Sequence, residues 1–153
     1  MDSKRFEDMK TSYDNDLIDV LATEISNGVI TVDESSDRHF STLAATFPLS
    51  GARIDWSAVP GAIESVAVGD KELESFMGFF EMACEGLDDD EILTYVGDGL
   101  TNCAYSGPIG VLRRHLAEFM SIPQHHYFVG PECKWCMTFM FEGDMAFGHA
   151  PRA

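Results

Sequence analysis

Four stretches of the chain carry apolar residues at helical spacing: residues 14–26, 36–46, 70–85 and 107–121. Such a stripe is the face that a surface helix buries. The clearest stripe consists of Leu73, Phe76, Met77, Phe80 and Cys84. Asp70 and Gly86 are typical residues for the start and the end of that helix, and Asp14 or Asp16 is expected to cap the first one. The pattern therefore predicts four helices.

The C-terminal third has the pattern of β-structure. Turn residues separate three short apolar runs, at residues 126–129, 135–141 and 145–147. In the middle run, alternating positions are apolar on both faces, with Trp135 on one face and Cys136 on the other. A strand that is apolar on both faces is central in its sheet and covered on both sides.

Two earlier strands are expected, at residues 29–32 and 92–96, and Gly97-Asp98-Gly99 is expected to break the second one. Residues 49–60 have the character of a loop with short turns. A chain of 153 residues fits one domain. We therefore predict a single α+β (or mixed α/β) domain over residues 1–153, with helices packed on a small, mostly antiparallel sheet that ends in a three-stranded meander.

The charge of the chain excludes several classes of partner. With 26 acidic and 10 basic side chains, the net charge is −16. Binders of DNA or RNA need clustered lysine and arginine, and anionic membrane surfaces attract the same residues. Direct binding to nucleic acid or to a membrane is therefore not expected. The absence of a secretory signal pattern and the four scattered cysteines favour a cytoplasmic protein with reduced thiols.

The acidic residues are concentrated in the middle of the sequence. Between Arg53 and Arg113 there are 12 acidic residues and one basic residue, Lys71, which gives this stretch a charge of −11. An acidic run can simply keep a surface solvated. It can also be a docking face that speeds encounter with a basic partner. Both interpretations remain open at the level of charge alone.

Few residues are arranged for catalysis or for metal binding. Cys133 and Cys136 form a C-x-x-C pair, but strand-like residues follow it, whereas a reactive thiolate needs a helix N-terminus. Adding His125 and His126 gives a set of two cysteines and two histidines, although adjacent histidines on a strand point to opposite faces. A small zinc-dependent or thiol-dependent protein is therefore an alternative. We expect no cofactor, no metal and no enzymatic activity.

Six short motifs lie between residues 45 and 148: FPL at 47–49, IDW at 54–56, YVGDGLT at 95–101, IPQHHYF at 122–128, WCMTF at 135–139 and FEGDMAFG at 141–148. Together they resemble a family of small acidic bacterial immunity proteins of contact-dependent growth inhibition and related polymorphic toxin systems. The resemblance implies a protein that binds the C-terminal toxin domain of a neighbouring gene's product and blocks it. Such toxins are often basic nucleases.

The acidic stretch is where we expect the toxin to bind. The predicted contact residues are Glu81, Glu85, Asp88, Asp89, Asp90, Glu91 and Asp98. The acids of the first helix, Asp14, Asp16 and Asp19, are a second candidate. The resembling motifs themselves are expected to hold the fold. An adaptor module with some other partner remains an alternative.

Overall fold

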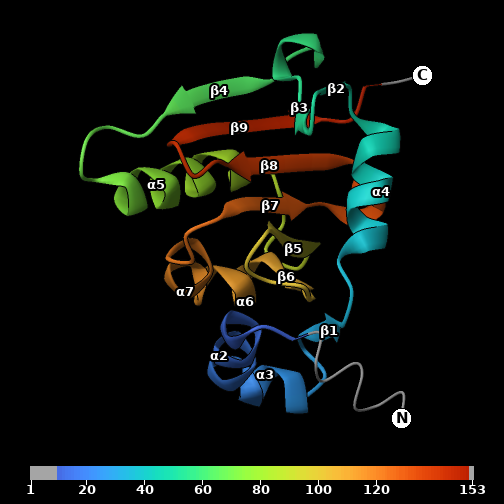
Figure 1. The fold of residues 1–153 in the computed structure, drawn as a ribbon, viewed down its shortest axis with the longest axis vertical. Coiled ribbons are helices and arrows are strands. Elements are labelled where there is room, and N and C mark those ends of the chain that lie inside the picture. Colours follow the sequence, from blue (N-terminus) through green and yellow to red (C-terminus); the bar gives the residue numbers. More distant parts are fainter. Residues whose placement is uncertain (1–9, 152–153) are drawn as a thin grey trace.

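A seven-stranded antiparallel sheet with helices on both faces forms the framework of residues 10–151, the part of the chain that the computed structural model describes (Figure 1). The strands lie in the order β1-β6-β5-β7-β8-β9-β4. β7, β8 and β9 are neighbours in the chain and in the sheet. The predicted α+β class and the C-terminal meander are therefore confirmed.

The helices within residues 10–151 are α2 (Ser12–Val20), α3 (Ala22–Ser26), α4 (Asp37–Thr46), α5 (Glu72–Cys84), α6 (Ile109–Arg113) and α7 (Leu116–Met120), with 3₁₀ turns η1 (Trp56–Ala58) and η2 (Pro131–Cys133). The strands of the large sheet are β1 (Thr31–Asp33), β4 (Ile63–Val66), β5 (Ile92–Asp98), β6 (Ala104–Pro108), β7 (His125–Val129), β8 (Trp135–Phe139) and β9 (Asp144–His149). β2 (Leu49–Ser50) and β3 (Arg53–Ile54) form a separate hairpin. No helix among these residues is both long and apolar enough to cross a membrane.

The sheet separates two apolar cores, and β8 contributes to both. Trp135, Met137 and Phe139 belong to the larger core, which α5 and α7 cover. Cys136 belongs to the smaller core, which also contains Leu43 of α4. Every residue of β8 is buried, as expected for the central, two-sided strand that the sequence predicts.

Helix α5 is confirmed, but its buried face differs from the predicted stripe. Leu73 and Met77 are 39% and 37% exposed, whereas Phe79 and Ala83 are buried. The face has shifted because the phenylalanines pack against strand aromatics: Phe79 contacts Phe139 with ring centroids 5.8 Å apart. The helix begins at Glu72 with Lys71 as its N-cap, so the prediction that Asp70 caps it was wrong.

Two of the predicted helices are each divided in the structure. Residues 14–26 form α2 and α3, which meet at the fully buried Leu21. Residues 107–121 contain the end of β6, then α6 and α7, which meet near His115. The His115 ring lies 2.7 Å from the carboxylate of Glu24 on α3, a tertiary contact that the local pattern cannot show.

The cap of the first helix is Thr11, and neither Asp14 nor Asp16 has that role. Thr11 accepts a hydrogen bond from the Asp14 N–H, and Asp14 accepts one from the Thr11 N–H, which is a capping box. The carboxylate of Asp14 is fully buried and also accepts from Asn102 N, Cys103 N and the Tyr105 hydroxyl, at 2.9, 3.2 and 2.7 Å. Asp14 therefore joins α2 to the segment that enters β6, and it is not available to a partner.

β5 continues through Gly97 and ends at Asp98, within the Gly97-Asp98-Gly99 sequence that was predicted to break it, so the strand is two residues longer than predicted. A β-carbon at Gly97 would lie 1.8 Å from Gln124 Nε2. The glycine therefore makes room for the buried Gln124 amide, which accepts from the N–H groups of Leu100 and Thr101 and donates to the Tyr95 hydroxyl. A glycine that admits a side chain and one that breaks a strand look alike in the sequence.

Candidate functional site

The predicted acidic contact surface begins at the end of α5 and continues into the loop before β5. Arg113 of α6 joins two of its carboxylates: its Nε lies 2.9 Å from Glu81, and its Nη1 lies 2.8 Å from Asp89. The hydrogen bond to Asp89 raises the pKa of Arg113 above its ordinary value. These two acids therefore share one internal cation, Arg113.

Glu85, Asp88 and Asp90 are exposed, and within residues 10–151 none of them forms an ion pair. They lie beside the Arg113 pairs, at the C-terminus of α5 and in the following loop. Three uncompensated carboxylates in this position are available to a cation from outside. We call Glu85, Asp88 and Asp90 the open acidic surface.

The remaining two predicted contact residues have different surroundings. Glu91 is half-buried and accepts a hydrogen bond from Trp135 Nε1 at 3.0 Å, so its carboxylate links β5 to the core tryptophan. Asp98 is exposed, at the far end of β5, where it is paired with His125 of β7. At about 3.4 Å per residue, the seven residues of β5 place it about 20 Å from Ile92, the end of the strand that follows the acidic loop.

The histidine and cysteine candidates do not converge on one site. His125 accepts a hydrogen bond from Phe141 N and lies beside Arg53, whereas His126 is buried on the opposite face of β7 against Tyr95. Cys133 and Cys136 are buried in the smaller core as free thiols. Among the described residues, no three histidine, cysteine or acidic side chains are placed to hold a metal ion.

The environment of the C-x-x-C pair disfavours thiolate chemistry. Burial raises the pKa of the Cys133 thiol and raises that of Cys136 even further. A nucleophilic cysteine needs the opposite shift. Cys133 follows Glu132, and both residues have positive φ angles of 57° and 54°, so η2 is a tight connection before β8 and not the start of a longer helix.

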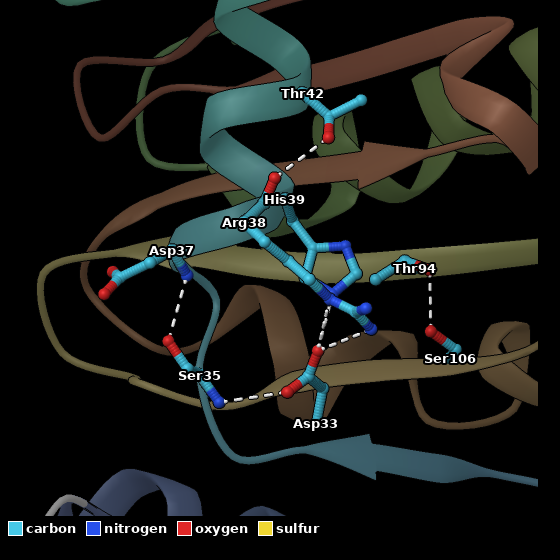
Figure 2. A network of polar contacts seen from close by, with 8 residues as sticks. All are labelled: Asp33, Ser35, Asp37, Arg38, His39, Thr42, Thr94 and Ser106. Atoms are coloured by element: carbon cyan, nitrogen blue, oxygen red, sulfur yellow. Dashed lines mark hydrogen bonds and ion pairs between the residues drawn. The ribbon is translucent and has the colours of Figure 1, made fainter.

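His39 is isolated in the sequence from other residues that could form a catalytic or metal site with it. In the structure it belongs to a polar network at the start of α4 (Figure 2). Asp33 of β1 accepts hydrogen bonds from Arg38 Nε at 2.9 Å and from the Ser35 N–H at 3.2 Å, and lies 3.1 Å from His39 Nε2. Burial raises the pKa of Asp33, but these donors outweigh burial and lower it overall. An acceptor two residues before Ser35 is a turn signal that the sequence does carry.

A histidine that is hydrogen-bonded to a carboxylate is also arranged as a general base would be. Among the described residues, however, no hydroxyl group is bonded to the second ring nitrogen of His39, and the nearby Thr94 and Ser106 hydroxyls are bonded to each other at 2.7 Å. The network lacks an activated nucleophile. Its contacts instead fasten α4 to β1.

His126 makes the fold sensitive to acid. Burial lowers its pKa from 6.5 to about 4, although the backbone at Met120 favours the charged form. The unfolded chain therefore binds a proton that the folded chain does not, so stability falls as pH falls from 6.5 to about 4, by about 3 kcal/mol in all.

Replacing His126 by glutamine is expected to remove most of this pH dependence. Urea unfolding at several pH values between 4 and 7 measures it. The matched control is His149→Gln, since His149 is exposed at the end of β9; this variant should keep the wild-type profile. Equal profiles for wild type and His126→Gln would contradict the assignment.

Comparison of the chain with protein-family models, with curated proteins and with solved structures finds no match.

Proposed function

We propose that the protein is an immunity protein, which binds a basic toxin domain in the bacterial cytoplasm and blocks it without catalysing a reaction of its own. The observation that carries the proposal is the open acidic surface. Glu85, Asp88 and Asp90 are exposed and have no cationic partner within residues 10–151. Carboxylates that the fold does not use are free to pair with lysine or arginine of another protein.

A nuclease is the class of toxin that fits this surface best. Enzymes that act on nucleic acid hold its phosphate backbone with lysine and arginine. An acidic protein can cover such a cleft. Electrostatic attraction also steers it towards the cleft before the two proteins touch. The net charge of −16 and the acid-rich middle of the chain also favour binding to a basic protein.

Neutralising the open acidic surface should slow binding to the toxin domain encoded beside the gene. The variant combines Glu85→Gln, Asp88→Asn and Asp90→Asn. We expect its association rate at low salt to fall by about tenfold, because exposed charges act mainly on encounter. Stopped-flow mixing with the purified toxin domain measures this rate, and inhibition of the toxin reports the function.

The matched control removes the same number of charges elsewhere. It combines Asp16→Asn, Asp19→Asn and Glu118→Gln, three acids on α2 and α7 that form no ion pair within the described residues. Both variants should keep wild-type stability to within about 0.5 kcal/mol, as is usual for surface substitutions. If the association rate falls more in the control than in the first variant, the contact surface lies on the first helix instead.

A further inference from the structure

One edge of the sheet is open. β4 is the last strand of the sheet (Figure 1). All four of its residues are exposed. Val66 is 60% exposed, and Val68, just beyond the strand, is 75% exposed. The strand carries neither lysine nor proline, the residues with which proteins commonly protect an edge. The strand at the opposite edge, β1, has only three residues, and the side chain of its Asp33 accepts a hydrogen bond from α4.

The backbone groups that face outward from β4 can be assigned. Ala67 N donates to Gly143 O at 2.8 Å, so these two residues form a hydrogen-bonded pair. In an antiparallel ladder such pairs alternate with non-bonded pairs. Ile63 and Ser65 therefore bond to β9, and the N–H and C=O groups of Glu64 and Val66 point away from the sheet. Within residues 10–151 those outward groups make no hydrogen bond.

A groove lies beside this edge, on one face of the sheet. It has a volume of about 480 Å³ and lies between the face of β4 and β9 and the segment that contains the β2–β3 hairpin and η1. Its lining includes the acidic residues Glu64, Asp144 and Asp55, together with Trp56. Register places Glu64 opposite Ala146 and Val66 opposite Asp144, and all four line the groove. The one cation of the lining, Arg53, is bound to Glu142.

We propose that the outer edge of β4 binds an extended basic segment of the partner, which adds a strand to the sheet and places lysine or arginine side chains over the acidic groove. Main-chain bonds to an open edge are an established mode of peptide recognition. Because side chains alternate along a strand, a segment with basic residues at every second position matches the groove. The inference depends on the proposed function only in taking the partner to be basic.

A second copy of the chain fits this edge less well. Two antiparallel β4 strands would bring Glu64 of each copy towards the other, and like charges across a strand pair are destabilising. A basic segment meets the same carboxylates with opposite charge. Charge therefore selects the partner, and self-association becomes one outcome of the test.

The direct test uses the whole protein and two capped peptides of equal composition. One has the sequence Lys-Val-Lys-Val-Lys-Val-Lys, and the other Lys-Lys-Val-Val-Val-Lys-Lys. Hydrogen exchange followed by NMR reports each amide. We expect the alternating peptide to slow exchange at Glu64 and Val66 by about tenfold when it is about 90% bound, and the second peptide to leave both amides unchanged. Equal protection by both peptides, or none by either, would overturn the inference.

Variants connect the edge to the toxin complex. Val66→Pro removes an outward N–H, and Val66→Lys adds a positive charge that repels a basic segment. If the proline variant does not fold, the lysine variant alone tests the inference. Each should weaken the complex by at least about tenfold, which is about 1.4 kcal/mol. The control is Val29→Lys, since Val29 is 39% exposed between α3 and β1 and belongs to neither acidic candidate surface; this variant should keep the wild-type affinity.

The outcomes separate the two proposals. A toxin complex that forms with unchanged affinity in both Val66 variants would overturn the β4 inference and leave the proposed function standing. A wild-type dimer in sedimentation analysis that Val66→Lys dissociates would assign the edge to a second copy of the chain, and would also overturn the inference. Failure of the wild-type protein to bind the toxin would count against the proposed function, whereas the peptide experiment would still judge the edge.

Discussion

Replacing Asp14 by alanine is expected to destabilise the fold by about 3–5 kcal/mol, because several buried donors lose their acceptor at once. The carboxylate accepts from the N–H groups of Thr11, Asn102 and Cys103 and from the Tyr105 hydroxyl. Chemical unfolding of the two proteins measures the difference. The control is Asp16→Ala on the same helix, since Asp16 is exposed and should change stability by less than about 0.5 kcal/mol.

The contribution of Asp14 should also depend on pH. Burial raises its pKa, but the N–H groups of Asn102 and Thr11 and the Tyr105 hydroxyl outweigh burial and hold the pKa below 3.8. A lowered pKa stabilises the fold above pH 3.8, and this stabilisation is lost as pH falls through the folded value. The stability difference between wild type and Asp14→Asn should therefore shrink in acid. A difference that stays constant down to pH 2 would contradict this role.

Replacing Gly97 by alanine is expected to cost about 3–4 kcal/mol. The new methyl group would lie 1.8 Å from Gln124 Nε2 and 2.5 Å from Thr101 Oγ1, so the buried amide must leave its place. Gln124 makes four hydrogen bonds there, each of which contributes about 1 kcal/mol to stability. Thermal unfolding measures the change.

Gly78→Ala is the matched control for Gly97→Ala. Gly78 lies in the middle of α5 and is exposed, and a β-carbon added there would have no neighbouring atom within 4 Å. Alanine there should stabilise the fold by about 0.5–1 kcal/mol, because glycine is a poor helix former. Destabilisation of equal size in both variants would show that the Gln124 contact is not the cause.

The elements with strong local patterns could be predicted from the sequence. The phenylalanines of α5 and the two-faced β8 mark a helix and a central strand, because burial sets those periods directly. β4 could not be predicted in this way. Its residues are all exposed, and its place depends on pairing with β9, which follows almost 80 residues later. The division of residues 107–121 likewise depends on distant contacts such as His115 with Glu24.

The candidate site shows the same division between local and distant information. Composition located the acid-rich stretch, but only the structure separates Glu85, Asp88 and Asp90 from acids that have internal partners. Glu81 and Asp89 are bound by Arg113, which lies at least 24 residues away in the sequence. The partner of Glu91, Trp135, is 44 residues away. Such pairings follow from the tertiary fold and leave no spacing signal.

The association rate of the wild-type protein with the neighbouring toxin domain, measured at two salt concentrations, tests the central claim most directly. Exposed charge acts through the solution, and salt screens it over about 10 Å at 0.1 M. We predict a complex whose association rate falls by about 10–100-fold between about 20 mM and about 500 mM salt. A complex that forms at the same rate in both, or no complex at all, would contradict recognition of a basic toxin by an acidic surface.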